Sequence, residues 1–318
     1  MSELHRFIFA GLPVRGAIVR LTGDWQEILQ RRAGNASHGA YATPVRDLLG
    51  EMLAAAVLMQ SNIKFDGALV MQVYGDGPVK LAVAEVGSDL RLRATATVSG
   101  TVAQDACLGD LVNVHGLGRC AVTLDPQDKQ PGQQPYQGVV SLRDESGASF
   151  MQVSAVLQHY MRQSEQLDTQ LVLAANLTVA AGLLIQRLPG VGGHGPTQSD
   201  ANDGDEAFNR ISILAASLTR EELLDLELDT VLHRLFWQEQ VQRFAPQTPR
   251  FACACSRARV GKMIVGLGLI EARSILAERG DIEVACEFCA LQYRFDAVDA
   301  AGLFVANLSE MTANPRIQ

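Results

Sequence analysis

The sequence lacks any apolar run of the roughly 18 residues that a membrane-spanning helix requires. The nearest run is Leu48–Met59, which Asp47 and Glu51 interrupt. The N-terminus carries an acid at Glu3 and only a short apolar stretch, unlike a secretory signal. We therefore expect a cytoplasmic protein that does not enter a membrane.

Several signatures of other protein classes are also missing. There is no P-loop, so nothing indicates ATP use, and no G-x-S-x-G elbow of a serine hydrolase. Nucleic-acid binding favours a basic surface, but the net charge is −8, and from Arg250 to the C-terminus basic and acidic residues balance. We expect neither ATP nor nucleic acid as a partner.

Cysteine is scarce, yet four of the six cysteines form two close pairs near the C-terminus. Cys253 and Cys255 make C-A-C, and Cys286 and Cys289 make C-E-F-C. Two such pairs separated by a small module can supply four thiolates to a tetrahedral zinc ion. Each pair is also close enough to form its own disulfide once the metal leaves, although the geometry is tight. The spacing therefore predicts one Zn²⁺ per chain and a redox-sensitive site.

The other two cysteines, Cys107 and Cys120, have no close partner in sequence. In a reducing cytoplasm, structural disulfides are disfavoured. We expect both residues to be buried and to act as small hydrophobic side chains.

Residues 1–189 are expected to form one α+β domain that is rich in sheet. Pro44–Gln60 is apolar on nearly every side, which is typical of a helix that is buried all round. Two β-rich runs flank the turn Gly75–Pro78 and predict a hairpin, Ala68–Tyr74 with Val79–Glu85. Further strands are expected at Arg6–Phe9, Arg15–Leu21, Leu90–Val98, Gly118–Leu124, Gly138–Leu142, Thr169–Asn176 and Ala180–Gln186, and helices at Asp24–Arg32 and Gln152–Gln163.

Residues 190–250 are expected to be a linker, flexible at first and then helical. The stretch Pro189–Asp205 is rich in Gly, Ser, Asn and Asp, and His194 within it is expected to be exposed and without a role. Thr219 and Glu222 form a capping-box signature, and a second helix is expected at Thr230–Val241. Such short helices need a surface to pack on. The sequence favours a simple connector over an element that folds only conditionally.

Residues 251–300 are expected to form the zinc module. Two short helices, Arg259–Leu267 and Glu271–Arg279, separate the cysteine pairs, and short strands at Ile282–Ala285 and Tyr293–Phe295 flank the second pair. The tail, residues 301–318, contains no motif and is expected to fray. The fold class is thus α+β: a sheet-rich N-terminal domain with a buried central helix, a helical linker and a small four-cysteine module.

The motifs together resemble the heat shock protein 33 family of redox-regulated bacterial chaperones. The zinc end carries the resemblance best, in CACSRARV from Cys253, SILAERGDIEVACEFC from Ser274 and YRF from Tyr293. Further matches, in family order over nearly the whole chain, are FIFAGLPVRGAIVRL, LLGEMLAAAVLMQ, YGDGPVKLAVAE, YQGVVSL, RQSEQL and LHRLFWQE.

The resemblance implies a holdase, which binds unfolding client proteins without ATP and prevents their aggregation under oxidative stress. In the family, the reduced protein holds zinc on the four cysteines and is inactive. Oxidation forms two disulfides, expected here as Cys253–Cys255 and Cys286–Cys289, ejects zinc and unfolds the module and the linker. The oxidised form is expected to be a homodimer.

Zinc loss should melt this module, because structural zinc contributes on the order of 10–16 kcal/mol to folding such modules. The linker helices would then lose support and offer apolar side chains to clients or to a second subunit. The candidate contacts are Leu223, Leu224, Leu226, Leu232, Leu235 and Phe236, together with Leu228, Val231 and Trp237.

Three features depart from the family. Ala290 follows Cys289 where the family favours Gly, at a position that can require positive φ. The Gly-rich stretch at 190–205 is longer than usual, which would alter how the linker docks. Cys107 and Cys120 are not switch residues of the family.

Other functions remain open on the residues alone. One is a purely structural zinc module, for which peroxide should leave activity unchanged. Another is a thiol–disulfide oxidoreductase using Cys286 and Cys289, which would need its C-x-x-C to open a helix. A zinc hydrolase is disfavoured because four cysteines close the coordination shell. We expect no enzymatic activity.

Overall fold

The computed structural model describes residues 1–35, 39–128, 132–189 and 198–313, and the chain divides into two compact units, Met1–Ala252 and Cys253–Gln318. The predicted flexible stretch at 190–197, including His194, lies outside the described residues. In the part of the chain that is described, no helix is long and apolar enough to cross a bilayer.

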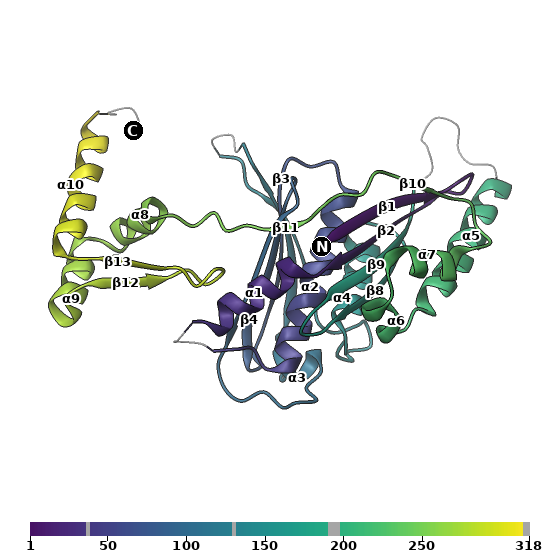
Figure 1. The fold of residues 1–318 in the computed structure, drawn as a ribbon, viewed down its shortest axis with the longest axis horizontal. Helices are drawn as coiled ribbons and strands as arrows, with labels where there is room; N and C mark the ends of the chain where they lie inside the picture. Colours follow the sequence, from purple (N-terminus) through teal and green to yellow (C-terminus); the bar gives the residue numbers. More distant parts are fainter. Residues whose placement is uncertain (36–38, 129–131, 190–197, 314–318) are drawn as a thin grey trace. The chain divides into compact units, whose positions relative to one another are not determined.

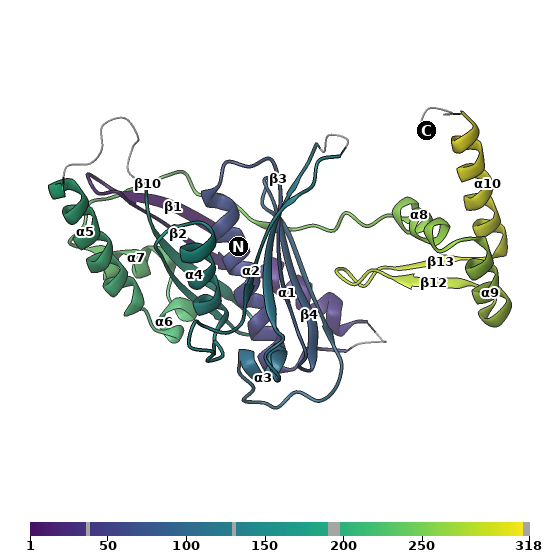
Figure 2. The ribbon, with the colours of Figure 1, turned by 180° about the vertical axis from the view of Figure 1, so that it is seen from behind.

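Two sheets build the first unit (Figures 1 and 2). One has five strands in the order β10-β1-β2-β9-β8 and the other six in the order β11-β5-β4-β3-β6-β7. All pairings are antiparallel except that of β11 with β5. The strands are β1 (Glu3–Phe9), β2 (Val14–Leu21), β3 (Gly67–Tyr74), β4 (Val79–Gly87), β5 (Arg91–Val98), β6 (Arg119–Pro126), β7 (Tyr136–Ser141), β8 (Thr169–Ala175), β9 (Ala180–Arg187), β10 (Val241–Arg243) and β11 (Arg250–Phe251).

The helix α2 (Thr43–Asn62) packs against strands of both sheets, and its residues from Leu48 to Gln60 are buried with the exception of Glu51. A helix that is apolar on nearly every side has no face suited to water, so it is stable only when packed on all sides, as between these two sheets. Gly50 permits close approach: a Cβ there would lie 2.5 Å from that of Ala175. The predicted central helix is confirmed, as are the other predicted elements of residues 1–189, including α1 (Gly23–Ala33) and α4 (Val153–Ser164). The short helix α3 (Leu108–Val112) was not predicted.

The linker helices cover the other face of the five-stranded sheet. They are α5 (Gln198–Ala216), α6 (Arg220–Asp225) and α7 (Leu228–Phe236). Along β9, Leu184 belongs to the core around α2, whereas Leu183 and Ile185 pack with the linker helices. The sheet is therefore apolar on both faces, and the predicted need of these helices for a packing surface is confirmed.

Two linker boundaries differ from the sequence expectation. The helix α5 begins at Gln198, inside the stretch to Asp205 that was expected to be flexible. The second predicted helix ends at Phe236 instead of Val241, because the chain turns there into β10 on the edge of β1.

The second unit combines α8 (Arg257–Leu267), α9 (Leu269–Arg279), the hairpin β12 (Ile282–Ala285) and β13 (Gln292–Phe295), and α10 (Ala297–Ala313). Its core among the described residues is small, with Ile264, Ala272, Ile282, Tyr293, Phe295 and Ala300 buried together. The expectation of a frayed tail is wrong for residues 301–313, because α10 runs through them and packs Leu303 against α8.

Candidate metal centre

The four clustered cysteines come from two loops of the second unit. Cys253 and Cys255 precede α8, whose first turn is capped by Ser256 accepting from the Arg259 N–H at 3.2 Å. Cys286 and Cys289 form the turn between β12 and β13. That turn is closed by the Ala290 N–H donating to the Cys286 carbonyl at 2.8 Å, and by the Cys286 N–H donating to the Leu291 carbonyl at 3.0 Å.

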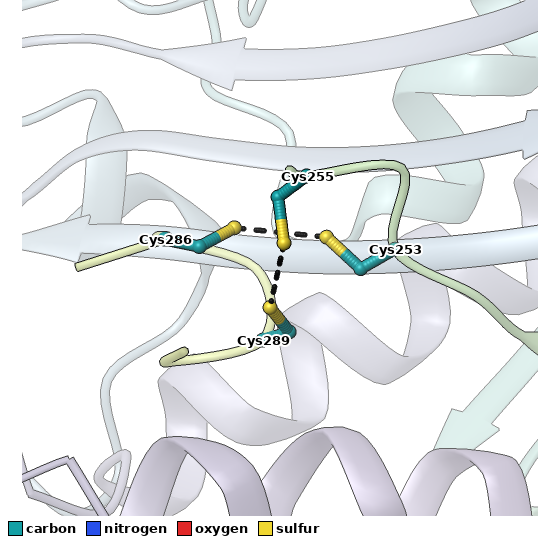
Figure 3. A group of neighbouring side chains, drawn as sticks. All are labelled: Cys253, Cys255, Cys286 and Cys289. Carbon is teal, nitrogen blue, oxygen red and sulfur yellow. Dashed lines mark hydrogen bonds between the residues drawn. The ribbon is translucent and has the colours of Figure 1, made fainter. Parts of the chain in front are cut away.

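The four sulfur atoms converge on one point (Figure 3). All lie within 4.8 Å of one another, with Cys253 and Cys286 at 3.6 Å and Cys255 and Cys289 at 3.2 Å. A zinc ion with bonds of about 2.3 Å to four sulfurs in a tetrahedron sets the sulfurs about 3.8 Å apart. The two separations given lie slightly below this value and all six lie within 4.8 Å, so small shifts of the side chains would admit the ion. Four thiolates also suit zinc better than a hard cation. The donor set and geometry therefore fit one such ion.

Tyr293 is a contact that sequence reasoning missed. Its hydroxyl donates to the sulfur of Cys255 at 3.2 Å. Tyr293 is the second residue of β13 and was expected to begin that strand, but its contact with a cysteine was not predicted.

The pKa values of Cys253, Cys255 and Cys289 are shifted in different directions. Burial raises the pKa of Cys253, and burial together with the neighbouring sulfurs raises that of Cys289. Burial acts in the same direction on Cys255, but hydrogen bonds from Tyr293 and the other thiols lower its pKa to about 7. The hydrogen bond to Cys255 in turn raises the pKa of Tyr293 to about 12. A sulfur that accepts a hydroxyl hydrogen bond is held in its charged form, which is the form that ligates metal and reacts with oxidants.

Ala290 has a left-handed backbone, with φ at 58°. This confirms that the position after the second pair requires positive φ. For a residue with a Cβ, this conformation costs about 1–2 kcal/mol. The turn that presents Cys286 and Cys289 therefore carries strain.

The other two cysteines lie in the first unit and differ from one another. Cys120 is fully buried, and burial raises its pKa to about 12, as expected for a small core side chain. Cys107 is only partly buried and caps α3 in a capping box with Asp110, so the expectation that it is buried is wrong.

The candidate client contacts are mostly covered in this structure. Five of the six are buried between the linker helices and the sheet, namely Leu223, Leu224, Leu232, Leu235 and Phe236. The sixth, Leu226, is partly buried. Trp237, expected to be exposed only after release, already has 68% of its surface exposed.

The C-x-x-C pair lies in a hairpin turn followed by β13, not by a helix. A thioredoxin-like site requires the motif at the start of a helix, whose N-terminus lowers the thiol pKa. The arrangement thus disfavours an oxidoreductase.

Comparison with known proteins covers nearly the whole chain. The family model "Hsp33 protein" matches residues 2–296. The 33 kDa chaperonin of Chromobacterium violaceum is 44% identical over 95% of this chain and 94% of its own length, and that of Methylobacillus flagellatus 43% identical over 96% of both. The crystal structure of the 33 kDa chaperonin from Thermotoga maritima has the same fold, with a TM-score of 0.73 at 20% identity over 96% of this chain and 99% of that one.

Proposed function

The chain belongs to the Hsp33 family of chaperones, and on that premise we propose that it is an ATP-independent holdase switched by oxidation of Cys253, Cys255, Cys286 and Cys289. The observation that carries this proposal is the convergence of those four sulfurs in a unit with a small core of its own. We place the protein in the cytoplasm, where reduced thiols can hold the metal.

In the reduced state, the four cysteines would bind one Zn²⁺ as thiolates. The ion would supply a cross-link between the chain before α8 and the β12–β13 turn, worth on the order of 10 kcal/mol to folding a small module. In this state the linker helices cover the five-stranded sheet and the protein is inactive.

Oxidation would convert the four sulfurs to two disulfides. Each disulfide forms from two cysteine thiolates that give up two electrons. One molecule of hydrogen peroxide accepts them, takes up two protons from solvent and leaves as two molecules of water. Sulfurs bound in disulfides are no longer thiolate ligands. The metal therefore leaves as the bridges form.

The pairing decides whether the module melts. Cys253–Cys255 and Cys286–Cys289 would close only tiny loops and leave the two ends of the module unconnected. The two sulfur–sulfur contacts at 3.6 and 3.2 Å instead join opposite pairs, and bridges formed that way would keep the cross-link. We propose the local pairing, because only that pairing removes the connection between the two ends.

Release of the linker would then uncover an apolar surface. Nineteen buried residues lie in the cluster between the sheet and the helices, including Phe7, Phe9 and Phe236. Unfolding clients, or a second copy of the oxidised chain, would bind there, since large exposed apolar patches mark interaction sites.

The test is light scattering of a heat-unfolding client, malate dehydrogenase, with zinc-loaded reduced protein and with peroxide-treated protein. We expect suppression by the oxidised form alone. Cys107→Ser keeps all four clustered cysteines and should switch like the parent chain. Equal behaviour of the two forms would assign the metal a purely structural role and overturn the switch.

Peptide mapping of the oxidised protein tests the pairing separately. Recovery of fragments joined as Cys253–Cys255 and Cys286–Cys289 is expected. Crosswise fragments would contradict the melting of the module, even if the oxidised protein suppressed aggregation.

A further inference from the structure

One continuous segment covers an edge of each sheet in the first unit. This segment, residues 240–252, is here called the strap. It runs first along β1, at the edge of the five-stranded sheet, and then along β5, at the edge of the six-stranded sheet (Figure 1). The two strands that it contributes, β10 and β11, are each the outermost strand of their sheet.

Backbone hydrogen bonds attach the strap along almost the whole length of β1. At one end the N–H of Ala10 donates to the carbonyl of Gln240 at 2.8 Å. At the other, Leu4 and Gln247 exchange two hydrogen bonds of 2.9 Å. Between them the N–H of Phe244 donates to the Arg6 carbonyl, and β10 pairs with Phe7–Phe9.

The strap then supplies hydrogen-bond partners to the backbone groups at the outer edge of β5. The N–H groups of Arg250 and Ala252 donate to the carbonyls of Leu90 and Leu92, each at 3.1 Å. The N–H of Phe251 points the other way and donates to the carboxylate of Asp24 at 2.8 Å. Without the strap, both strands would present unpaired backbone groups, which is how sheet edges recruit further strands.

The side chains of the strap attach it at only a few points. Phe251 packs against the core around α2, Phe244 lies beside the Arg6 guanidinium, and Arg243 pairs with Asp229. From Gln240 to Arg250 only Pro249 is buried, and Val241 and Gln247 are partly buried. Pro246 and Pro249 have no N–H to donate, so pairing is interrupted between the two edges. A segment held largely by backbone hydrogen bonds, with most of its side chains exposed, belongs to the low-stability end of a fold. A client strand that forms backbone hydrogen bonds along the whole of an edge can therefore displace the strap.

We propose that clients bind by adding an extended apolar segment as a strand to the edges of β1 and β5 that the strap occupies in the reduced protein. This inference rests on the proposed holdase function and names what the released surface recognises. Main-chain hydrogen bonds can hold a client strand of any sequence, whereas alternate side chains of that strand extend the apolar face of the sheet.

The residues beside the β1 edge favour an apolar occupant. Phe7 and Phe9 are buried on the face that the linker helices cover, and Leu4 is buried on the face toward α2. A strand added beside β1 would place alternate side chains level with these residues. Unfolding proteins expose such alternating apolar stretches from their own sheets, which makes them the partner that fits.

The direct test removes N–H groups from the partner. A fluorescent ten-residue peptide of alternating Val and Thr is titrated into the oxidised full-length protein and followed by anisotropy. A matched peptide carries esters in place of four consecutive central amides, so that donors are lost on both of its edges without added bulk. We expect the ester peptide to bind at least about tenfold more weakly, since each lost hydrogen bond matters. Equal affinities would overturn the proposal.

Hydrogen exchange identifies the occupied edges. On oxidation the amides of Leu4 and Ala10 should lose protection, and the amide peptide should restore it. Protection that persists without peptide and rises with protein concentration would assign the edges to a second copy of the chain and overturn client binding there.

The aggregation assay of the proposed function is run on the same samples. If oxidised protein suppresses aggregation while both peptides bind equally, the edge proposal fails and the holdase stands. If oxidised protein does not suppress aggregation, the proposed function fails, whatever the peptides do.

Discussion

At Ala290, a left-handed backbone and a side chain with a Cβ meet in the turn that presents two metal ligands. The conformation is imposed by the turn, whose hydrogen bonds from Ala290 and Cys286 close it on both sides. Glycine adopts this conformation without steric cost. The alanine therefore makes the folded turn less stable than glycine would at the same position.

We predict that Ala290→Gly stabilises the zinc-loaded second unit by about 1 kcal/mol, because the left-handed strain is removed. Competition with a chromogenic chelator should show slower metal release. The matched control is Ala285→Gly, in the strand β12, which should cost about 0.5–1 kcal/mol instead. A destabilising effect of Ala290→Gly would contradict the strain.

Glu51 is a partly buried carboxylate on α2 that pairs with Arg220 of the linker helix α6. Burial raises its pKa to about 7, although Arg220, at 3.7 Å, acts in the opposite direction, and Asp47 reinforces the rise. The folded chain therefore holds a proton on Glu51 that the unfolded chain releases near pH 4.5. Stability from this group is fully present below pH 4.5 and is lost as pH rises through about 7.

We predict that Glu51→Gln flattens this dependence and stabilises the first unit at pH 8 by up to about 3 kcal/mol, since one pKa unit corresponds to 1.36 kcal/mol. Urea unfolding at pH 5 and pH 8, followed by the emission of the buried Trp25, measures it. Glu27→Gln, which removes an exposed carboxylate on α1, serves as control. An unchanged slope in Glu51→Gln would show that another group carries the dependence.

At the scale of elements, sequence patterns predicted the parts that depend on local chemistry. The apolar surround of α2, the turn of the β3–β4 hairpin and the capping box at Thr219 all appear in the structure. The strands β10 and β11 were missed, since they are short, flank the proline-containing stretch 244–249 and exist only through pairing with distant edges. The helix α10 was missed although its signal is local: Asp296 accepts the N–H groups of Val298 and Asp299.

The candidate site divides in the same way. The four cysteines were found from spacing alone, and the structure brings their sulfurs together. The contact of Tyr293 with Cys255 was not found, because it depends on how the hairpin lies against the loop before α8. The sequence predicted that the leucine-rich linker helices need a surface to pack on. It did not predict which face of the sheet covers them.

A capping box closes the N-terminus of α6, the second helix of the linker. The Thr219 hydroxyl accepts from the Glu222 N–H at 3.2 Å, and the Glu222 carboxylate accepts from the Thr219 N–H at 3.0 Å. We predict that Thr219→Ala costs about 1 kcal/mol, raises hydrogen exchange in α6 and shortens the activation time with peroxide. Thr219→Ser retains the hydroxyl and should behave like the parent. Faster activation without faster exchange in α6 would argue against this mechanism.

The helix α10 should support the metal centre by packing on α8. Gly261 approaches so closely that a Cβ there would lie 2.7 Å from Leu303. We predict that Leu303→Ala lowers the melting temperature of the second unit, with a cost of about 1–2 kcal/mol for a partly buried leucine. Val298→Ala, on a residue 80% exposed, is the control and should have almost no effect. Equal effects would mean that α10 does not stabilise the unit.

At the scale of the whole molecule, the two units differ in what holds them together. The first contains a large core around α2 and a second apolar cluster under the linker helices, whereas the second has a core cluster of six buried residues among those described. A small core must be supplemented by a cross-link or a metal.

We predict that a chelator under reducing conditions unfolds the second unit and leaves the core around α2 intact. Circular dichroism should lose the helix signal of α8–α10, while the emission of Trp25, fully buried in the first unit, stays constant. Cys107→Ser should respond like the parent chain. Retention of all helix signal after metal removal would show that the module folds on its own residues.

The position of the strap in the chain also fixes when the sheets can close. On the ribosome, strands β1 to β9 are all synthesised by Arg187, yet the segment that covers β1 and β5 ends only at Ala252. At roughly 5–20 residues per second, translation needs seconds to cross that interval. Each newly made molecule therefore passes through a stage in which both edges are bare, before any oxidant has acted. Neighbouring nascent chains on the same messenger are the first proteins it can meet in that state.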